Sequence, residues 1–261
     1  HCLDSVTFIC ILKACANIGA IEKGKRLHNE MVSRGLLKEN IVLTTAVLDM
    51  YVKFGLLSKA HQMLLDDIPL RDVVAWNTLI VGYSQQRQDH EAITCFERMR
   101  SEGLLPDVVT FTCIFKVCGH MGFIKIGKRC HSEIVKLGLL EKDIMLGNAL
   151  VDMYAKCGLL TKAQHVLEDL TIRDVVSWTT LIAGYAQRGK AAEALECFEE
   201  MLGECIAPNE ITFLCVLTAC SHSGKLDKAQ MYFSDMSEKY RLSPNVQHHT
   251  CMLGIYANAG Y

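Results

Sequence analysis

Two short stretches carry residue types that could bind zinc and move protons. H-N-E at 28–30 and H-S-E at 131–133 match the first half of the zinc deaminase signature, in which His binds the metal and Glu acts as acid and base. The second half, P-C-x-x-C, is absent from the chain. His248 and His249 also stand without a further set of ligands. We therefore expect no metal, no cofactor and no catalytic residue, so the chain is predicted not to be an enzyme.

Cysteine is frequent, with 13 residues, but its spacing is not that of a metal knuckle or a disulfide framework. The number is odd and no C-x-x-C occurs. Several cysteines recur at one spacing, as Cys10/Cys15, Cys113/Cys118 and Cys215/Cys220. Free cysteine is commonly a small core residue, so we expect these side chains to be reduced and buried at equivalent places. A reducing compartment follows from this interpretation.

Composition limits the classes of protein that need to be considered. The 261 residues are 50% hydrophobic and 21% charged, with four Pro, which favours a globular or solenoidal chain over a disordered one. No apolar run reaches 18 residues, so no membrane span is expected. The net charge of −2 argues against a broad basic face but is compatible with a locally basic groove. The chain starts at His1, so we expect a fragment, and the lack of a targeting segment carries no information.

The sequence repeats itself over a long period. RDVVAWNTLIVGY at 71–83 and RDVVSWTTLIAGY at 173–185 match at ten of thirteen positions and begin 102 residues apart. Residues 6–37 likewise match 109–140, and residues 48–64 match 151–167. Each long period divides into three related units, at 5–40, 41–72, 73–107, 108–143, 144–174, 175–209, 210–245 and a partial 246–261. Periods of 31–36 residues predict a single solenoid array over the chain.

Each unit is predicted to form two helices. In unit 73–107, apolar residues follow the i, i+3, i+4, i+7 spacing twice, as Trp76, Leu79, Ile80, Tyr83 and then Ala92, Cys95, Phe96, Met99. Gly103 is a plausible helix end, and Pro106 prevents continuation. Unit 175–209 repeats the design. One unit cannot bury both stripes alone, so neighbouring hairpins must stack and the predicted fold class is an all-α solenoid.

Two families of helical repeat fit these lengths. A-x-x-x-F in the second helix, at 92–96 and 194–198, suits the peptide-binding tetratricopeptide repeat. That repeat has its first-helix Gly directly after Leu, whereas here Gly precedes Tyr83 and Tyr185. The chain resembles instead the pentatricopeptide repeat (PPR) family, in its plant subclass of alternating P, L and S motifs. The resemblance is carried by PDVVTF (106–111), RDVVSWTTLIAGYAQRGKAAEALECFEEM (173–201), NALVDMYAKCGLLTKA (148–163) and ITFLCVLTACSHSGKLDKA (211–229).

The resemblance implies a right-handed superhelix of about seven and a half repeats, with L units at 5–40, 108–143 and 210–245, S units at 41–72, 144–174 and 246–261, and P units at 73–107 and 175–209. It also implies binding of single-stranded RNA, one base per repeat, selected by the fifth and last residues of each unit. The expected pairs are Thr45/Asp72 for G, Asn77/Asp107 for U, Thr112/Asp143 for G with weaker selection, Asn148/Asp174 for U and Thr179/Asn209 for A.

Other positions follow from the same resemblance. The pairs Ile9/Asn40 and Leu214/Asn245 have an apolar fifth residue, so their units are expected to be spacers. The implied target is 5′-n-G-U-(G)-U-A-n-3′. Apolar second residues are expected to flank the bases, namely Val42, Val74, Val109, Met145 and Val176. Lys53 and Lys156 end the first helix of S units, where they either meet phosphates or are ordinary solvated lysines.

The expected partner is therefore single-stranded RNA, with no membrane. The chain would be the recognition part of an organellar RNA-processing factor in a chloroplast or mitochondrion, foremost one that specifies cytidine-to-uridine editing sites. A deaminase would lie outside residues 1–261, and a protein editing cofactor could dock on L units. The alternative is a protein-interaction scaffold of tetratricopeptide type. Polar fifth and last residues in P and S units favour RNA, because a peptide scaffold gives no reason to keep them.

Overall fold

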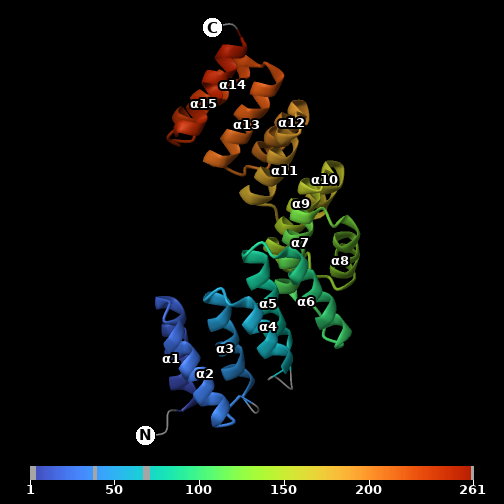
Figure 1. Cartoon of the computed structure of the whole chain (residues 1–261). Helices are drawn as coiled ribbons and strands as arrows, with labels where there is room; N and C mark the ends of the chain where they lie inside the picture. Colours follow the sequence, from blue (N-terminus) through green and yellow to red (C-terminus); the bar gives the residue numbers. More distant parts are fainter. Residues whose placement is uncertain (1–3, 38–39, 67–70, 260–261) are drawn as a thin grey trace. The chain divides into compact units, whose positions relative to one another are not determined.

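The computed structural model describes residues 4–37, 40–66 and 71–259, and these fold into 15 α-helices without a β-strand (Figure 1). The first helices of successive hairpins are α1 (Ser5–Ile18), α3 (Ile41–Lys53), α5 (Val73–Gln85), α7 (Val108–Met121), α9 (Ile144–Lys156), α11 (Val175–Gln187), α13 (Glu210–Ser223) and α15 (Val246–Asn258). The second helices are α2 (Ile21–Ser33), α4 (Leu57–Asp66), α6 (Asp89–Ser101), α8 (Ile124–Lys136), α10 (Leu160–Asp169), α12 (Ala191–Gly203) and α14 (Leu226–Glu238).

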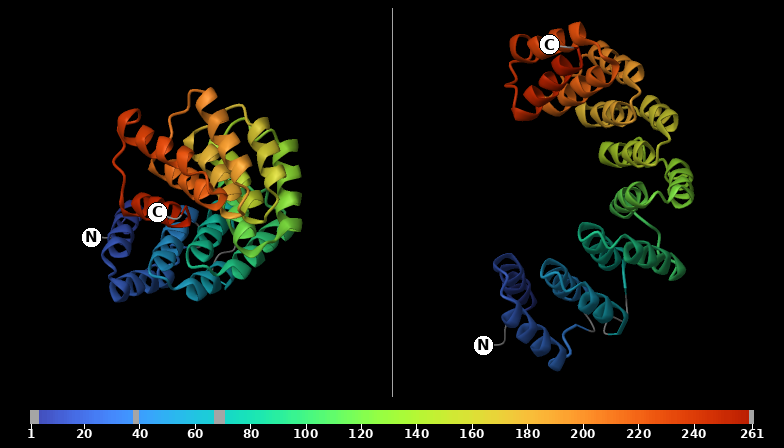
Figure 2. Two further views of the ribbon diagram at one scale, coloured as in Figure 1. Left: turned by 90° about the horizontal axis from the view of Figure 1, so that it is seen from above. Right: turned by 45° about the horizontal axis from the view of Figure 1, so that its top comes forward.

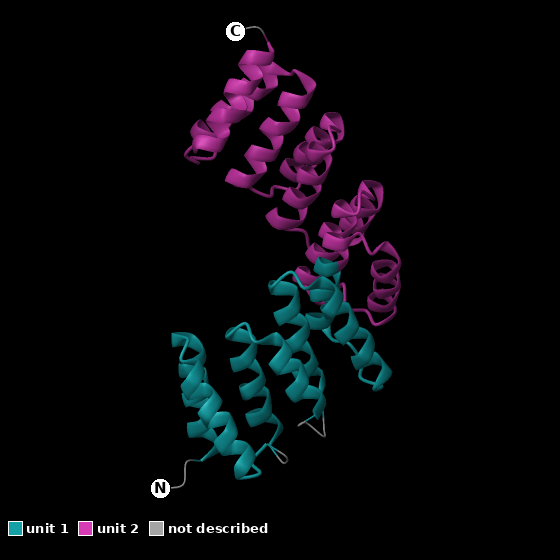
Figure 3. Cartoon of the chain, in the orientation of Figure 1, with its two compact units in different colours: residues 1–117 teal, residues 118–261 magenta. Residues whose placement is uncertain are grey.

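The helices gather into two compact units, residues 1–117 and 118–261 (Figure 3). In the first unit, α1, α3 and α5 pack side by side, and each is paired with the second helix of its own hairpin. In the second unit, α9, α11, α13 and α15 form the same kind of row, and α10, α12 and α14 also touch the first helix of the next hairpin (Figure 2). The prediction of an all-α fold of stacked helical hairpins is confirmed.

The repeated apolar stripes form the core of each unit. Trp76, Leu79, Ile80 and Tyr83 are all buried, as are their counterparts in α11. The same holds for Ala92, Cys95, Phe96 and Met99 in α6 and for the equivalent residues of α12. Helices of 13 residues are marginal alone in water, so burial of these stripes between neighbouring hairpins is what stabilises them.

The Gly before each repeated Tyr marks a close approach between helices. A Cβ atom on Gly82 would lie 2.6 Å from Cγ1 of Val52, and one on Gly184 would lie 2.9 Å from Cδ2 of Leu160. These separations are shorter than carbon atoms tolerate. Gly is therefore required there because α5 packs directly on α3 and α4, and α11 packs in the same way on α9 and α10.

Every first helix begins directly after an Asp or Asn whose side chain caps it. The side-chain oxygen accepts a hydrogen bond from a backbone N–H in the first turn, which satisfies a donor that the helix itself leaves free. The capping residues are Asp4, Asn40, Asp72, Asp107, Asp143, Asp174, Asn209 and Asn245. The last residue of each sequence unit is thus also the helix N-cap of the next unit.

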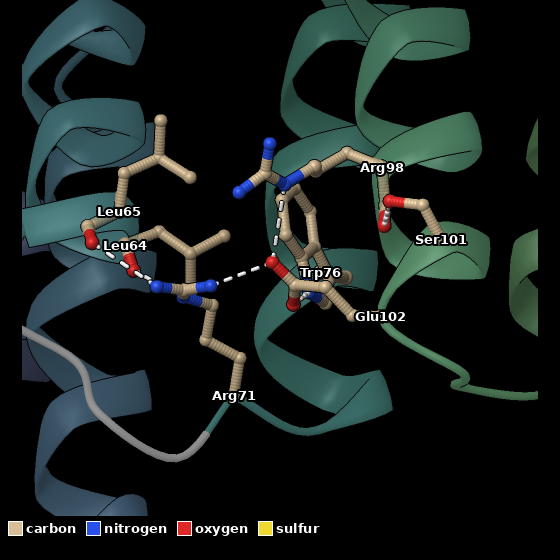
Figure 4. Close-up of polar contacts among 7 residues, drawn as sticks. All are labelled: Leu64, Leu65, Arg71, Trp76, Arg98, Ser101 and Glu102. Carbon is tan, nitrogen blue, oxygen red and sulfur yellow. Dashed lines mark hydrogen bonds and ion pairs between the residues drawn. The ribbon is translucent and has the colours of Figure 1, made fainter.

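The repeated R-D-V-V-x-W stretch holds two hairpins together through one carboxylate (Figure 4). Nη1 of Arg71 lies 2.6 Å from Oε1 of Glu102, and Nε1 of Trp76 donates to Oε2 of the same Glu102 at 3.2 Å. Nε of Arg71 also donates to the carbonyl of Leu64, at the end of α4, at 2.9 Å. The guanidinium therefore connects the end of one hairpin to the next.

The second copy of this stretch repeats the contacts. Arg173 pairs with Glu204 at 2.7 Å, Trp178 donates to Glu204 at 3.0 Å, and Arg173 donates to the carbonyl of Leu170. The repeat in sequence is accordingly a repeat of an inter-hairpin clamp, defined here as the Arg, Trp and Glu side chains together.

Candidate nucleic-acid interface

Exposed aliphatic side chains recur at one place in the first helices. The second residue of each first helix from α1 to α13 is an aliphatic residue or Met that is between 50% and 67% exposed. These residues are Val6, Val42, Val74, Val109, Met145, Val176 and Ile211. Large apolar side chains at the same exposed position in successive repeats offer flat contact surfaces at regular intervals, and they include every residue that the sequence analysis expected to flank a base.

Several of the expected recognition residues line a groove of about 380 Å³ in the first unit. Val42 and Thr45 come from α3, Asp72 precedes α5, and Val74 lies in its first turn. Lys13 of α1 contributes a positive charge to the same groove. The fifth and last residues of unit 41–72 and the second residues of this unit and the next thus line one groove, and their role in base selection stays a prediction.

A second groove, of about 350 Å³, lies in the second unit between α9, α11 and α13. Thr179, Lys156 and Ile211 line it, together with Arg188, which the sequence analysis did not single out. The groove thus combines two cations with one carboxylate, Asp152, and with apolar and hydroxyl side chains, a mixture that suits a ligand with both negative charge and flat faces.

The two lysines expected near phosphates are held by their own helices. Lys53 pairs with Asp49 at 2.9 Å and Lys156 pairs with Asp152 at 2.7 Å, each one helical turn apart. Both lysines are exposed, and such surface pairs are weak, so the ammonium groups remain available to a stronger anion.

Two of the expected residue pairs are joined by direct hydrogen bonds. Nδ2 of Asn77 donates to Oδ1 and Oδ2 of Asp107 at 2.9 and 3.0 Å, across 30 residues of sequence. Nδ2 of Asn148 donates to Oδ1 and Oδ2 of Asp174 at 3.2 and 3.4 Å. A carboxylate only accepts hydrogen bonds, so it fixes which end of the amide turns toward it.

The threonine pairs are arranged differently. Oγ1 of Thr179 lies 2.7 Å from Oγ1 of Thr212, which in turn donates to Oδ1 of Asn209 at 3.0 Å. Oγ1 of Thr45 donates to the carbonyl of Ile41 in its own helix. Thr112 belongs to the first compact unit and Asp143 to the second, so their pairing stays a prediction.

Thr110 and Thr212, the third residues of α7 and α13, are not among the residues expected from the sequence. Both side chains are fully buried, and each contacts the fifth residue of the preceding unit. The available signal was the spacing D-x-x-T at 107–110 and N-x-x-T at 209–212, which is typical of a helix start.

The histidines of the two H-x-E stretches have a structural role. Nδ1 of His28 lies 2.8 Å from the hydroxyl of Tyr51, and Nδ1 of His131 lies 2.9 Å from that of Tyr154, each across a hairpin boundary. Among the described residues, no group of three or more His, Cys, Asp or Glu could hold a metal ion.

The prediction that the paired cysteines are buried is correct for the second cysteine of each pair and wrong for the first cysteine of each pair. Cys15, Cys118 and Cys220 are buried, and burial raises the pKa of the Cys118 thiol to about 12. Cys10 is exposed, and Cys113 is only partly buried. Five residues along a helix correspond to a rotation of about 140° from the core stripe, which explains the difference.

None of the helices in the described part of the chain has the length and apolar character needed to cross a bilayer.

The paired helices, the stacking and the recurrent N-caps define a helical-hairpin repeat protein of the α-solenoid class. The model described as PPR repeat family matches residues 71–120 and 173–222, and the model described as PPR repeat matches 6–36, 148–175 and 211–240. The chain belongs to the pentatricopeptide repeat family.

Similar proteins come from Arabidopsis thaliana. A pentatricopeptide repeat-containing protein is 37% identical over 97% of this chain and 34% of its own length. A mitochondrial one is 34% identical over 99% of this chain and 46% of its own length. A chloroplastic one is 35% identical over 98% of this chain and 34% of its own length. The chain spans about a third to a half of the length of these curated relatives.

Solved structures support the fold. The pentatricopeptide repeat protein PPR10 in complex with an 18-nt psaJ RNA element superimposes with a TM-score of 0.78, at 23% identity over 99% of this chain and 38% of that one. The structure of PPR10 from maize gives a TM-score of 0.55 at 22% identity, over 99% of this chain and 42% of that one.

Proposed function

We propose that this chain binds single-stranded RNA in a sequence-dependent manner, one base per repeat. The observation that carries the proposal is the arrangement of the two asparagine pairs. In both, the fifth residue of a unit is bonded to its last residue, as Asn77 to Asp107 and Asn148 to Asp174, and the second residues of the first helices are exposed aliphatic side chains or Met. Unstacked bases are bound by flat contacts on their faces and by polar side chains at their Watson–Crick edges, and this arrangement offers both.

The repeat boundaries are part of the proposal. Each of the units 5–40, 41–72, 73–107, 108–143, 144–174, 175–209 and 210–245 contains two helices, and 246–261 contains α15. The division into P, L and S types rests on the lengths and motifs of these units. The proposed target is 5′-n-G-U-(G)-U-A-n-3′, with the L units at the two ends acting as spacers because Ile9 and Leu214 cannot hydrogen-bond a base.

The biological setting is proposed from the family. Relatives named mitochondrial and chloroplastic favour an organellar protein. We infer that the array directs an RNA-processing activity to its site, foremost cytidine-to-uridine editing, with the deaminase supplied from outside residues 1–261. A protein editing cofactor would dock on the L units. The chain itself would hold the RNA without acting on it chemically.

Binding to a randomised RNA pool tests the proposal. The 261-residue chain is incubated with single-stranded RNA at moderate salt, and the bound fraction is sequenced. An enriched G-U-x-U-A register is the expected result. The matched control is the same chain with Asn77→Ala and Asn148→Ala, which removes both amides and should lose the two U preferences while leaving G and A in place.

Two other outcomes contradict the proposal in different ways. Enrichment of an unrelated register would reject the base assignments but keep RNA as the ligand. No retention of RNA by the chain and no enriched sequence would reject RNA binding by this chain and favour the protein-interaction scaffold.

A further inference from the structure

Two units carry the same proposed base-selecting pair but surround it differently. Units 73–107 and 144–174 both present Asn as fifth residue and Asp as last residue. The Asn77 amide is held closer to its carboxylate, at 2.9 and 3.0 Å, than the Asn148 amide, at 3.2 and 3.4 Å. The two units also differ at the third residue of the following helix, Thr110 in one and Ser177 in the other.

In the first of these units, that residue is Thr110. Its hydroxyl is fully buried and has two acceptors within reach, Oδ1 of Asn77 at 2.6 Å and Oδ1 of Asp107 at 2.9 Å, of which the amide oxygen is the nearer. Asp107 holds the other end of the same amide and is itself bonded to the backbone N–H of Thr110 at 2.9 Å. Both ends of the Asn77 amide are therefore fixed, the nitrogen by a carboxylate and the oxygen by a hydroxyl.

In unit 144–174, the equivalent residue is Ser177, and its hydroxyl points to its own helix cap instead of to the Asn148 amide. Its hydroxyl donates to the backbone carbonyl of Asp174 at 2.8 Å and accepts from the backbone N–H of Asp174 at 2.9 Å. Oδ1 of Asn148 is left buried without a hydrogen-bond partner in the chain. A buried carbonyl without a donor costs free energy, so the Asn148 amide is held at its nitrogen end alone, through the longer bonds to Asp174.

Orientation of the amide decides which base it accepts. The nitrogen end donates and the oxygen end accepts, so turning the amide over exchanges donor and acceptor. Uracil and cytosine differ by such an exchange at N3 and at the group on C4. We propose that Thr110 is a positioning residue for base selection, which fixes the Asn77 amide and makes unit 73–107 discriminate U from C more strictly than unit 144–174. This inference rests on the proposed RNA-binding function.

The same arrangement recurs in the other P unit. Thr212, the third residue of α13, contacts the fifth residue Thr179 at 2.7 Å. The S unit 41–72 is followed by Ala75 at this place, and the fifth residue Thr45 bonds to its own helix instead. After both P units, a Thr hydroxyl at the third position of the next helix contacts the fifth residue. After both complete S units, the residue at that position is Ala75 or Ser177, and it makes no such contact.

Binding of the 261-residue chain to matched RNAs tests the proposal. The RNAs carry the proposed target, or the same target with C in place of U at the base of unit 73–107 or at that of unit 144–174. The quantity measured is the ratio of Kd for C to Kd for U at each base. In the unsubstituted chain we expect this ratio to be about threefold to tenfold larger at unit 73–107, which corresponds to one hydrogen bond.

Two reciprocal variants locate the cause. Thr110→Val keeps the shape and removes the hydroxyl, so the ratio at unit 73–107 should fall to that at unit 144–174, whose own ratio serves as the internal control. Ser177→Thr should raise the ratio at unit 144–174, and it decides the matter if Thr110→Val does not fold. Thr94→Val, on the exposed face of α6, should change neither ratio. Equal ratios in the unsubstituted chain, or ratios that neither variant moves, overturn the proposal.

A measurement without RNA separates this inference from the proposed function. In the free protein, the side-chain amide protons of Asn77 should exchange with solvent at least several-fold more slowly than those of Asn148, and Thr110→Val should remove the difference. If no RNA binds, the proposed function fails, and with it the role in base selection. The exchange rates then decide whether Thr110 fixes the amide, and equal rates for the two residues overturn that part as well.

Discussion

Transplanting one pair into another unit tests whether the fifth and last residues select the base. Unit 73–107 carries Asn77 and Asp107, and unit 175–209 carries Thr179 and Asn209. The double substitution Asn77→Thr with Asp107→Asn converts the first pair into the second. Its expected result is a change of preference from U to A at one base of the RNA.

The structure gives the size of the accompanying stability change. The transplant loses the two bonds from Nδ2 of Asn77, at 2.9 and 3.0 Å. It keeps the helix cap, because Asn209 accepts from the backbone of Thr212 at 2.9 Å just as Asp107 accepts from that of Thr110. A new hydroxyl at position 77 meets Thr110 as Thr179 meets Thr212. The net change in unfolding free energy should therefore stay within about 1 kcal/mol.

Fluorescence anisotropy with two RNAs that differ at that base measures the effect. A wrong base typically costs about 1–3 kcal/mol, or about 5- to 150-fold in Kd, so the order of the two Kd values should reverse. The single change Asn77→Thr should shift the preference from U toward G. The reverse transplant, Thr179→Asn with Asn209→Asp, is the matched control and should change A to U at its own base. A folded double variant that still prefers U by the original ratio would refute the reasoning.

Three further predictions concern the fold. Gly82→Ala should lower the free energy of unfolding by about 1–3 kcal/mol because its Cβ meets a neighbouring helix. Gly254→Ala, with open space around it, should raise the free energy of unfolding by about 0.5–1 kcal/mol. Urea denaturation measures both changes, and changes of the same sign would contradict the close-packing argument. Glu102→Gln removes the charge that the inter-hairpin clamp shares, and should destabilise the chain by about 1–2 kcal/mol in the same assay, less so at high salt. Burial lowers the pKa of His61, so the unfolded chain binds a proton at this residue more readily than the folded chain, and the Tm should fall as the pH drops below about 6.5. His61→Gln keeps a partner for the hydroxyl of Tyr83 and should weaken this pH dependence of the Tm. A pH profile that the substitution leaves unchanged would contradict the role of His61.

The fold was predictable from sequence because its signals are repeated. Trp76 and Tyr83 belong to a stripe that recurs after 102 residues, and only stacked hairpins bury such stripes in every unit. The contact between Asn77 and Asp107 was predictable because it follows position in the repeat, and the base selection assigned to it stays a prediction. The resemblance to the family, rather than the spacing alone, pointed to that pair.

The rest of the candidate site depends on the direction of individual hydrogen bonds, which a sequence does not specify. Thr110 and Ser177 both carry a hydroxyl three residues after a capping Asp. The Thr110 hydroxyl reaches the Asn77 amide in the preceding hairpin as well as its own cap Asp107, whereas the Ser177 hydroxyl donates to the backbone of its own cap. Cys10 shares a repeated spacing with Cys15 but lies outside the stripe, so similarity of pattern did not imply similarity of burial.

The double role of the last residue has a consequence for how such arrays change over generations. Asp and Asn cap helices about equally well, and so do Ser and, nearly, Thr. A codon change of one nucleotide converts Asp to Asn, and another converts Asn to Thr. Mutations at Asp107 or Asn209 within this set should therefore leave the protein folded while its ligand preference moves. Under the proposed RNA-binding function, a lineage would drift from one transcript to another through intermediates that are all stable, because the position proposed to specify the target tolerates the residues that start a helix.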